Sequence, residues 1–208
     1  GQVKYVGELL SSMNPSELNN TAVILGDEKM LIPLINSIPS NVKNINVTMG
    51  YPLKNSNIYS FFYLLLNIHT KNQNSFYYKN IISLISHELI SPVLNKQNDI
   101  RKIIKEENLI YMSKKDIINI DNGNKSVYEL LFSKWNNINE GLSSCLELIE
   151  VIKKYYSENP ENDLINLELL YSVNKIFLQI KVSSVKLDYL KSISSLKIIF
   201  KELCDMST

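Results

Sequence analysis

The sequence contains few of the residues that interrupt helices. Only six glycines and six prolines occur in 208 residues, so obligatory breaks are rare. The many Leu, Ile, Lys, Glu and Asn residues suit helices better than a sandwich or a barrel. The composition therefore predicts a mainly α-helical chain, and its length is sufficient to bury a real core.

Long apolar runs and cysteines are also scarce. The longest apolar run, residues 58–68, is interrupted by Ser60 and is roughly half of the ~20 residues that span a bilayer. The two cysteines, Cys145 and Cys204, lie in half-apolar helical contexts, which suits reduced thiols better than disulfides. Residues 1–10 show no secretory signal. We therefore expect a cytoplasmic protein with no membrane partner.

A strong charge of either sign is missing as well. The chain has 22 basic and 21 acidic residues and a formal net charge of +1. It therefore lacks the positive field that is typical of a self-sufficient nucleic-acid-binding protein. Contact with DNA is not excluded by this balance, but the composition does not indicate it.

The first 92 residues predict a helix followed by a small α/β segment. Apolar residues at helical spacing predict a helix over 3–13. Two short apolar runs rich in β-branched residues, 21–25 and 45–49, then flank a helix expected over 28–38. Two strands separated by a helix imply a short parallel pair, that is, a βαβ unit. A helical bundle is expected to follow it.

From Ile58 onward the apolar period is helical. The expected helices cover 58–71, 76–90, 98–107 and 126–135, and three longer ones cover 142–156, 164–180 and 189–203. The helix at 164–180 carries apolar residues on two faces, so we expect it to contact neighbours on two sides. Residues 121–124 form the best turn signal. A soft boundary near 92 separates residues 1–92 from a helical, inserted subdomain over 93–208.

Asp27 and Glu28 are the weak candidates for binding a cofactor. They follow an apolar run, as the Asp-Glu pair that holds magnesium does in nucleotide hydrolases. Such chemistry also needs a Gly-x-x-x-x-Gly-Lys-Ser/Thr phosphate cradle, which the sequence lacks. We therefore interpret both carboxylates as capping and charging the first turn of a helix. A nucleotide-dependent enzyme that uses them stays a third hypothesis.

Neither histidine has a second metal ligand at a suitable spacing. His69 and His87 lie on different predicted helices, so we expect surface or partly buried imidazoles and no metal site. Cys145 lies on an apolar stripe, which favours a buried structural thiol over a nucleophile. The sequence therefore predicts no catalytic residue.

Two aromatic clusters, 61–63 and 76–78, have side chains on which single-stranded bases can stack. Both clusters begin predicted helices whose later positions are Leu and Ile. This pattern is typical of an entry staple or a helix–helix contact. We therefore favour core packing for both clusters.

Several segments of the chain match one family when taken together. They are Thr21-Ala22-Val23-Ile24-Leu25-Gly26-Asp27-Glu28, Asn46-Val47-Thr48-Met49-Gly50-Tyr51-Pro52-Leu53, Ser60-Phe61-Phe62 through Leu66, Phe76-Tyr77-Tyr78-Lys79-Asn80 and Ser86-His87-Glu88-Leu89-Ile90. This series resembles the start of the second motor domain of UvrD/Rep-type superfamily I helicases, in the version found in AddB-type subunits of bacterial helicase–nuclease complexes. The resemblance covers roughly residues 20–92 and implies a helical insertion over 93–208.

The resemblance implies an inactivated, DNA-guiding subunit. Active relatives carry an arginine that binds nucleotide phosphates where Gly26 stands here, and glycine has no cation to complement phosphate. The parent protein is expected to hold a nucleotide-binding domain upstream and a PD-(D/E)XK nuclease domain downstream. ATP and Mg²⁺ are possible cofactors of that parent only, and the missing arginine argues against ATP hydrolysis even there. This segment is expected to hold no cofactor and to contact DNA, a partner helicase–nuclease subunit or the remaining domains.

A second hypothesis from a different class stays open. The last three helices carry apolar stripes that would suit a helical protein–protein interaction module with no nucleic-acid role. The first hypothesis predicts DNA binding that depends on salt, whereas the second predicts self-association that does not.

Overall fold

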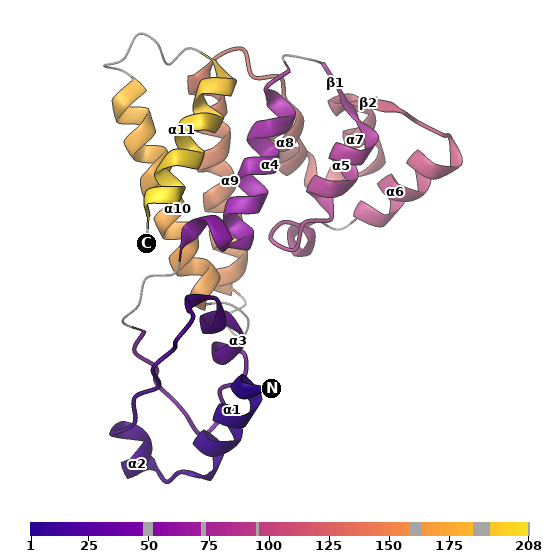
Figure 1. Cartoon of the computed structure of the whole chain (residues 1–208). Helices are drawn as coiled ribbons and strands as arrows, with labels where there is room; N and C mark the ends of the chain where they lie inside the picture. Colours follow the sequence, from indigo (N-terminus) through magenta and orange to yellow (C-terminus); the bar gives the residue numbers. More distant parts are fainter. Residues whose placement is uncertain (48–51, 72–73, 95, 159–163, 185–191, 208) are drawn as a thin grey trace. The chain divides into compact units, whose positions relative to one another are not determined.

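The computed structural model describes the chain in two compact units (Figure 1). It describes every residue except 48–51, 72–73, 95, 159–163, 185–191 and 208, and it omits the side chains of 28, 164–165 and 184. The first unit covers residues 1–51 and the second 52–207. The chain as a whole is mainly α-helical, as predicted, and most of its helices lie in the second unit. The boundary expected near residue 92 lies inside the second unit.

The first unit contains short helices around a small core. They are α1 (Gln2–Ser12), α2 (Pro15–Asn19), a 3₁₀ turn (Glu28–Met30) and α3 (Leu31–Ile35). Leu10, Leu31 and Leu34 are its buried apolar side chains. The helix expected over 3–13 is confirmed, whereas the one expected over 28–38 is a 3₁₀ turn followed by a shorter helix.

The predicted parallel strand pair is wrong. Residues 21–25 and 45–47 belong to no strand or helix, and residues 48 and 49 lie outside the described part of the chain. A β-branched apolar run becomes a strand only where a neighbouring strand completes its hydrogen bonds. Within the described residues, the only sheet is antiparallel and lies elsewhere, in the second unit.

That sheet pairs β1 (Ser75–Tyr77) with β2 (Tyr111–Ser113). Ser75 lies opposite Ser113, and Tyr77 lies opposite Tyr111. Each strand continues directly into a helix, α5 (Tyr78–Ile85) after β1 and α7 (Lys114–Ile120) after β2. The helix expected over 76–90 is therefore shorter at both ends: its first residues form β1, and α5 ends at Ile85.

The two strand–helix units have similar sequences. Phe76 corresponds to Met112, and Ile81 corresponds to Ile117 at the same spacing; all four side chains are buried. An antiparallel pair is locally twofold symmetric, and here Phe76 and Met112 lie opposite each other at its centre. Equivalent positions of the two units are therefore found at opposite ends of the sheet.

The remaining helices of the second unit enclose one continuous apolar core. They are α4 (Asn57–His69), α6 (Gln97–Glu106), α8 (Lys125–Phe132), α9 (Ile138–Glu158), α10 (Leu164–Ser184) and α11 (Ile193–Met206). Figure 1 shows α4, α9, α10 and α11 side by side as a bundle, and α8 packs on α9. Phe177 and Phe200 stack at 4.9 Å between ring centroids and join α10 to α11. Among the described helices, none is both long enough and apolar enough to cross a membrane.

Helix α10 buries only one of its two apolar faces completely. Val173, Phe177 and Ile180 are buried. Tyr171 and Leu178, on the other face, are about half exposed. Helix α10 nevertheless contacts α4, α9 and α11, and Leu167, on the same face as Tyr171, packs against the core. The prediction that this helix contacts more than one neighbour is therefore confirmed, but part of its second apolar face stays exposed.

Candidate functional site

Asp27 caps a helical turn in the first unit. Its Oδ1 accepts a hydrogen bond from the backbone N–H of Lys29 at 3.0 Å, and its carbonyl accepts from the N–H of Met30. The backbone of Glu28 belongs to the same 3₁₀ turn. This geometry is what the capping interpretation predicts. Among the residues whose side chains are described, no group of three His, Cys, Asp or Glu is placed to hold a metal ion.

His69 is a buried, neutral imidazole. Its Nε2 lies 2.8 Å from the carbonyl oxygen of Leu131, so this nitrogen carries the proton and donates. The ring stacks on Trp135 at 3.7 Å between centroids, and Phe76 meets it edge-on. Burial lowers the pKa of His69 to about 4, although the bond to Leu131 opposes this shift. A neutral ring that makes these contacts is part of the core.

Ser60 and His87 have the separation of a nucleophile and its base but not the required proton arrangement. Ser60 Oγ lies 2.8 Å from His87 Nε2. The N–H of Leu89 donates to His87 Nδ1 at 3.3 Å, so the neutral ring carries its proton on Nε2. The Ser60 hydroxyl donates to the carbonyl of Asn57 at 2.7 Å. His87 therefore donates to the serine, whereas a general base would accept its proton.

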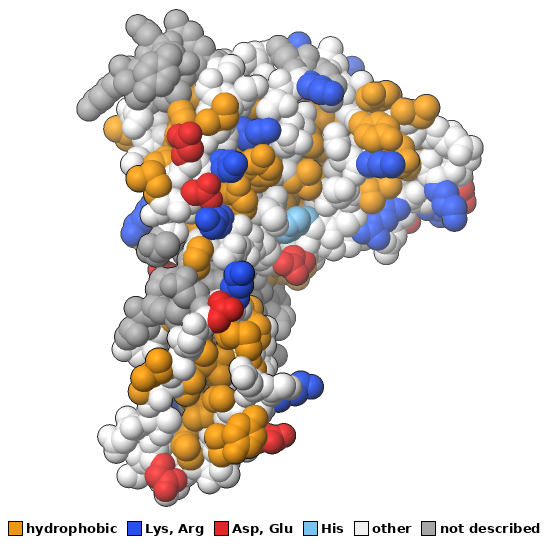
Figure 2. Space-filling view, in the orientation of Figure 1, with side chains coloured by type: hydrophobic (Ala, Val, Ile, Leu, Met, Phe, Trp, Pro, Cys, Tyr) orange, Lys and Arg blue, Asp and Glu red, His pale blue; other side chains and the backbone are white. Residues whose placement is uncertain are grey.

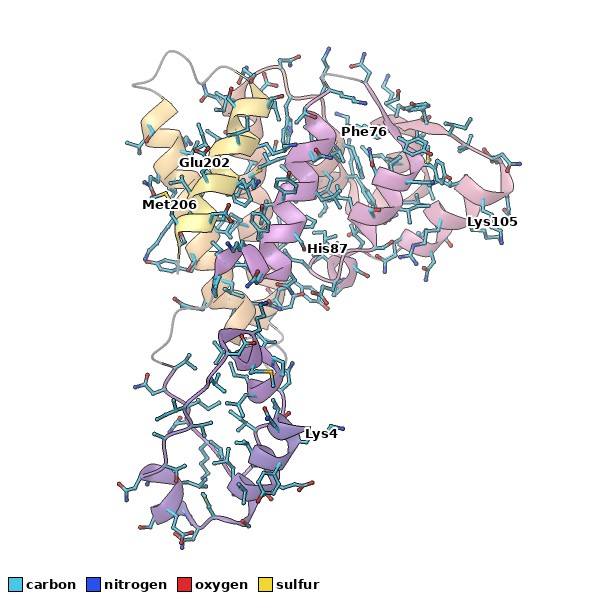
Figure 3. All side chains as sticks on the ribbon, in the orientation of Figure 1. Lys4, Phe76, His87, Lys105, Glu202 and Met206 are labelled. Carbon is cyan, nitrogen blue, oxygen red and sulfur yellow. The ribbon has the colours of Figure 1, made fainter. Side chains whose placement is uncertain are left out.

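The Ser60–His87 contact instead connects two parts of the second unit. Figure 3 shows His87 lying against α4. Burial lowers the pKa of His87, and Glu88 partly opposes that shift. A neutral ring is therefore favoured. Its bond to Ser60 holds the chain after α5 against the start of α4, and the bond from Leu89 orients the ring.

Asp121 is a buried carboxylate in the turn between α7 and α8. Its Oδ2 accepts hydrogen bonds from Asn124 Nδ2 at 2.8 Å and from Tyr128 Oη at 3.0 Å. Burial and the nearby carboxylate raise the pKa of Tyr128. The turn predicted over 121–124 is confirmed as a 3₁₀ turn, Asn122–Asn124, that this carboxylate stabilises.

Both cysteines are buried. Burial raises the pKa of the Cys204 thiol to about 12 and also raises the pKa of Cys145. The thiolate is the reactive form of cysteine. These thiols are therefore inert, and the prediction of a buried thiol at Cys145 is confirmed.

The two aromatic clusters are used differently. Phe61, Phe62 and Phe76 are fully buried, which confirms core packing for these three residues. Tyr77 and Tyr78 are only partly buried. Their neighbour across the sheet, Tyr111, is 58% exposed. The phenylalanines therefore pack in the core, whereas Tyr77, Tyr78 and Tyr111 are at the surface and can contact a ligand.

Tyr77, Tyr78 and Tyr111 form a group that we name the tyrosine surface. The Tyr77 ring lies 4.8 Å from that of Tyr78 and 5.8 Å from that of Tyr111. The backbone N–H of Tyr78 also donates to the carbonyl of Ile110, which is itself exposed. Two strands that are far apart in the sequence thus assemble one exposed aromatic patch.

Basic side chains lie beside this patch. Lys79 Nζ lies 6.0 Å from the centroid of the Tyr78 ring, within the outer range of a cation–π contact. Figure 2 shows blue Lys and Arg side chains beside the orange patch over β2, α5 and α6, and Lys105 on α6 is labelled in Figure 3. An aromatic patch bordered by cations is suited to binding an anionic ligand that has flat rings.

Sequence reasoning did not identify Tyr111. It lies in the region 91–125, where the helical pattern is weakest. The correspondence between Phe76 and Met112 is a sequence signal for a second strand at 111–113, but not for the contact of Tyr111 with Tyr77. No family model, no curated protein and no solved structure matches this chain. Its function is therefore inferred from its residues and their geometry.

Proposed function

We propose that this chain is a non-catalytic segment of an AddB-type, helicase- and exonuclease-like protein of DNA double-strand-break repair. Its first residues belong to the second motor-like domain, and its helical part forms an inserted subdomain. The segment shapes a path for DNA or braces a partner subunit. ATP and Mg²⁺ would act elsewhere in the parent protein.

The observation that carries this proposal is the exposure of two apolar segments in the first unit. Ile24 is 92% exposed, and Val23, Ile45 and Val47 are each more than two-fifths exposed. Among described residues, no backbone hydrogen bond involves residues 22–26 or 43–47. β-Branched residues beside unpaired backbone groups are typical of strands that lack their neighbours in a sheet.

The places of these two segments in the sequence also support the proposed relation to AddB-type proteins. Residues 21–28 and 46–53 are the two stretches that resemble strands of the second motor domain. In a complete motor domain, further strands would cover their apolar side chains. The exposed segments are therefore what a piece of such a domain would present.

The candidate catalytic groups support a non-catalytic role. Asp27 is engaged in capping, and His87 donates to Ser60. We expect no ATPase or nuclease turnover from the chain. Asp27→Ala tests this directly, because turnover that disappears in this variant would overturn the proposal.

DNA binding is the decisive assay. Fluorescence anisotropy with labelled forked DNA, at about 50 and about 200 mM salt, should show binding that weakens as salt rises, because lysines displace counterions from phosphates. An absence of binding to forked, single-stranded and duplex DNA would contradict a DNA-guiding role.

The alternative, a helical protein–protein interaction module, is favoured by one observation. Tyr171, Leu178 and Val182 expose apolar surface along α10, and such stripes dock other helices. Sedimentation of the wild type and of a Leu178→Asp variant tests it. Self-association that is insensitive to salt and lost in the variant would support this module over the DNA-guiding segment.

A further inference from the structure

We propose that the tyrosine surface binds single-stranded nucleic acid, with bases stacked on its rings and phosphates held by Lys79 and Lys115. This inference rests on the proposed function, because it names the form of nucleic acid and the surface that receives it. The surface lies on the outer face of the β1–β2 sheet.

The platform is rigid. Tyr77 and Tyr111 lie opposite each other in the antiparallel ladder. The next residues along the strands, Phe76 and Met112, are buried on the other face of the sheet and anchor it to the core. Tyrosine has few rotatable bonds, so stacking on anchored rings costs little side-chain entropy.

The twofold relation of the strands places Lys79 and Lys115 at opposite ends of the sheet, and Lys79 is at the end that carries the tyrosines, 6.0 Å from the centroid of the Tyr78 ring. Lys79 and Lys115 are the second residues of α5 and α7, and both are exposed. Neither is in an ion pair with a described acidic side chain, whereas Lys102 on α6 pairs with a glutamate. Asp116, beside Lys115, accepts two hydrogen bonds from Ser113 at 2.8 Å. The two ammonium groups are therefore available to phosphates.

The charge of the chain favours single strands over duplex. A net charge of +1 provides few cations for the many phosphates of a duplex. Stacking must then contribute much of the affinity, and only unpaired bases offer their faces to aromatic side chains. An apolar protein partner would instead cover the two ammonium groups and remove their hydration without compensation.

The test compares variants of the full chain by anisotropy with labelled oligothymidylate, the matched duplex and inorganic polyphosphate as probes. Tyr111→Ala removes the most exposed ring of the platform, and Tyr111→Phe keeps that ring. Tyr171→Ala is the matched control, because Tyr171 is 51% exposed and Lys175 Nζ lies 4.4 Å from its ring centroid, away from the sheet. Circular dichroism verifies that each variant folds.

We expect wild type to bind oligothymidylate more tightly than duplex or polyphosphate. Tyr111→Ala should weaken this binding about tenfold, within the range for one stacked base, while Tyr111→Phe and Tyr171→Ala leave it unchanged. Equal affinities of Tyr111→Ala and wild type would overturn the inference and leave the proposed function standing. Equally tight polyphosphate binding would also overturn it. Failure of the wild type to bind any DNA would refute the DNA-guiding role in the proposed function, and this inference with it.

Discussion

Replacing His69 with glutamine should change how the stability of the second unit depends on pH. Burial lowers the pKa of His69 from 6.5 to about 4, so the unfolded chain binds a proton more tightly than the folded chain does. The stability that the neutral ring confers is fully present above the unfolded-state value. It is lost as pH falls from there through the folded value.

The expected loss follows from the gap between the two pKa values. At about 1.36 kcal/mol per pH unit, the full gap corresponds to roughly 3 kcal/mol. By about pH 5, roughly 2 kcal/mol of this should already be lost. The groups that contact the ring, Leu131, Trp135 and Phe76, do not titrate, so the shift is caused by burial in an apolar site.

Urea denaturation followed by the fluorescence of Trp135, the single tryptophan, measures this loss. Wild type should lose roughly 2 kcal/mol between about pH 7.5 and about pH 5 beyond any loss in His69→Gln. Glutamine retains a donor for the Leu131 carbonyl but does not titrate. His87 is present in both proteins, and its contribution therefore cancels. Parallel stability–pH curves for the two proteins would refute the argument that His69 is buried neutral.

Two further predictions concern packing and hydrogen bonding. Gly7→Ala should destabilise the first unit by about 1–3 kcal/mol, because its added Cβ would clash with the carbonyl oxygen of Ser37, and faster hydrogen exchange of α1 would report this. Gly26→Ala is the control, since a Cβ there meets nothing within 4 Å; equal exchange in both variants would contradict the close packing. Tyr128→Phe removes a hydrogen bond to the buried carboxylate of Asp121 and should cost the second unit about 2 kcal/mol in urea denaturation. An unchanged unfolding midpoint would show that this bond contributes nothing.

Helical periodicity identified the helices because their packing repeats a local pattern. In the helix expected over 164–180, the spacing of Phe177 and Ile180 puts them on one face, and both are buried. The strands were less predictable, since aromatic residues such as Phe76 and Tyr77 also occur in the first turn of a helix. Only the ladder with Met112 and Tyr111, more than thirty residues later, makes them a strand. A partner at that distance is not visible in a local window.

The candidate site shows the same division. The sequence was enough to interpret Asp27 as a cap, because capping involves residues adjacent in the chain. It did not reveal that Tyr111 lies beside Tyr77, nor that His69 is buried deeply enough to stay neutral at low pH. Both facts depend on neighbours supplied by other elements.

The sequence by itself determined that this protein is mainly helical, where most of its helices lie and that Cys145 is buried. Helix formation and capping depend on contacts within a few residues, so local patterns encode them. Only the tertiary structure decided which strands pair, which apolar faces stay exposed and which tyrosines share a surface. Such features arise from contacts between distant segments, and these form only when the whole chain has packed.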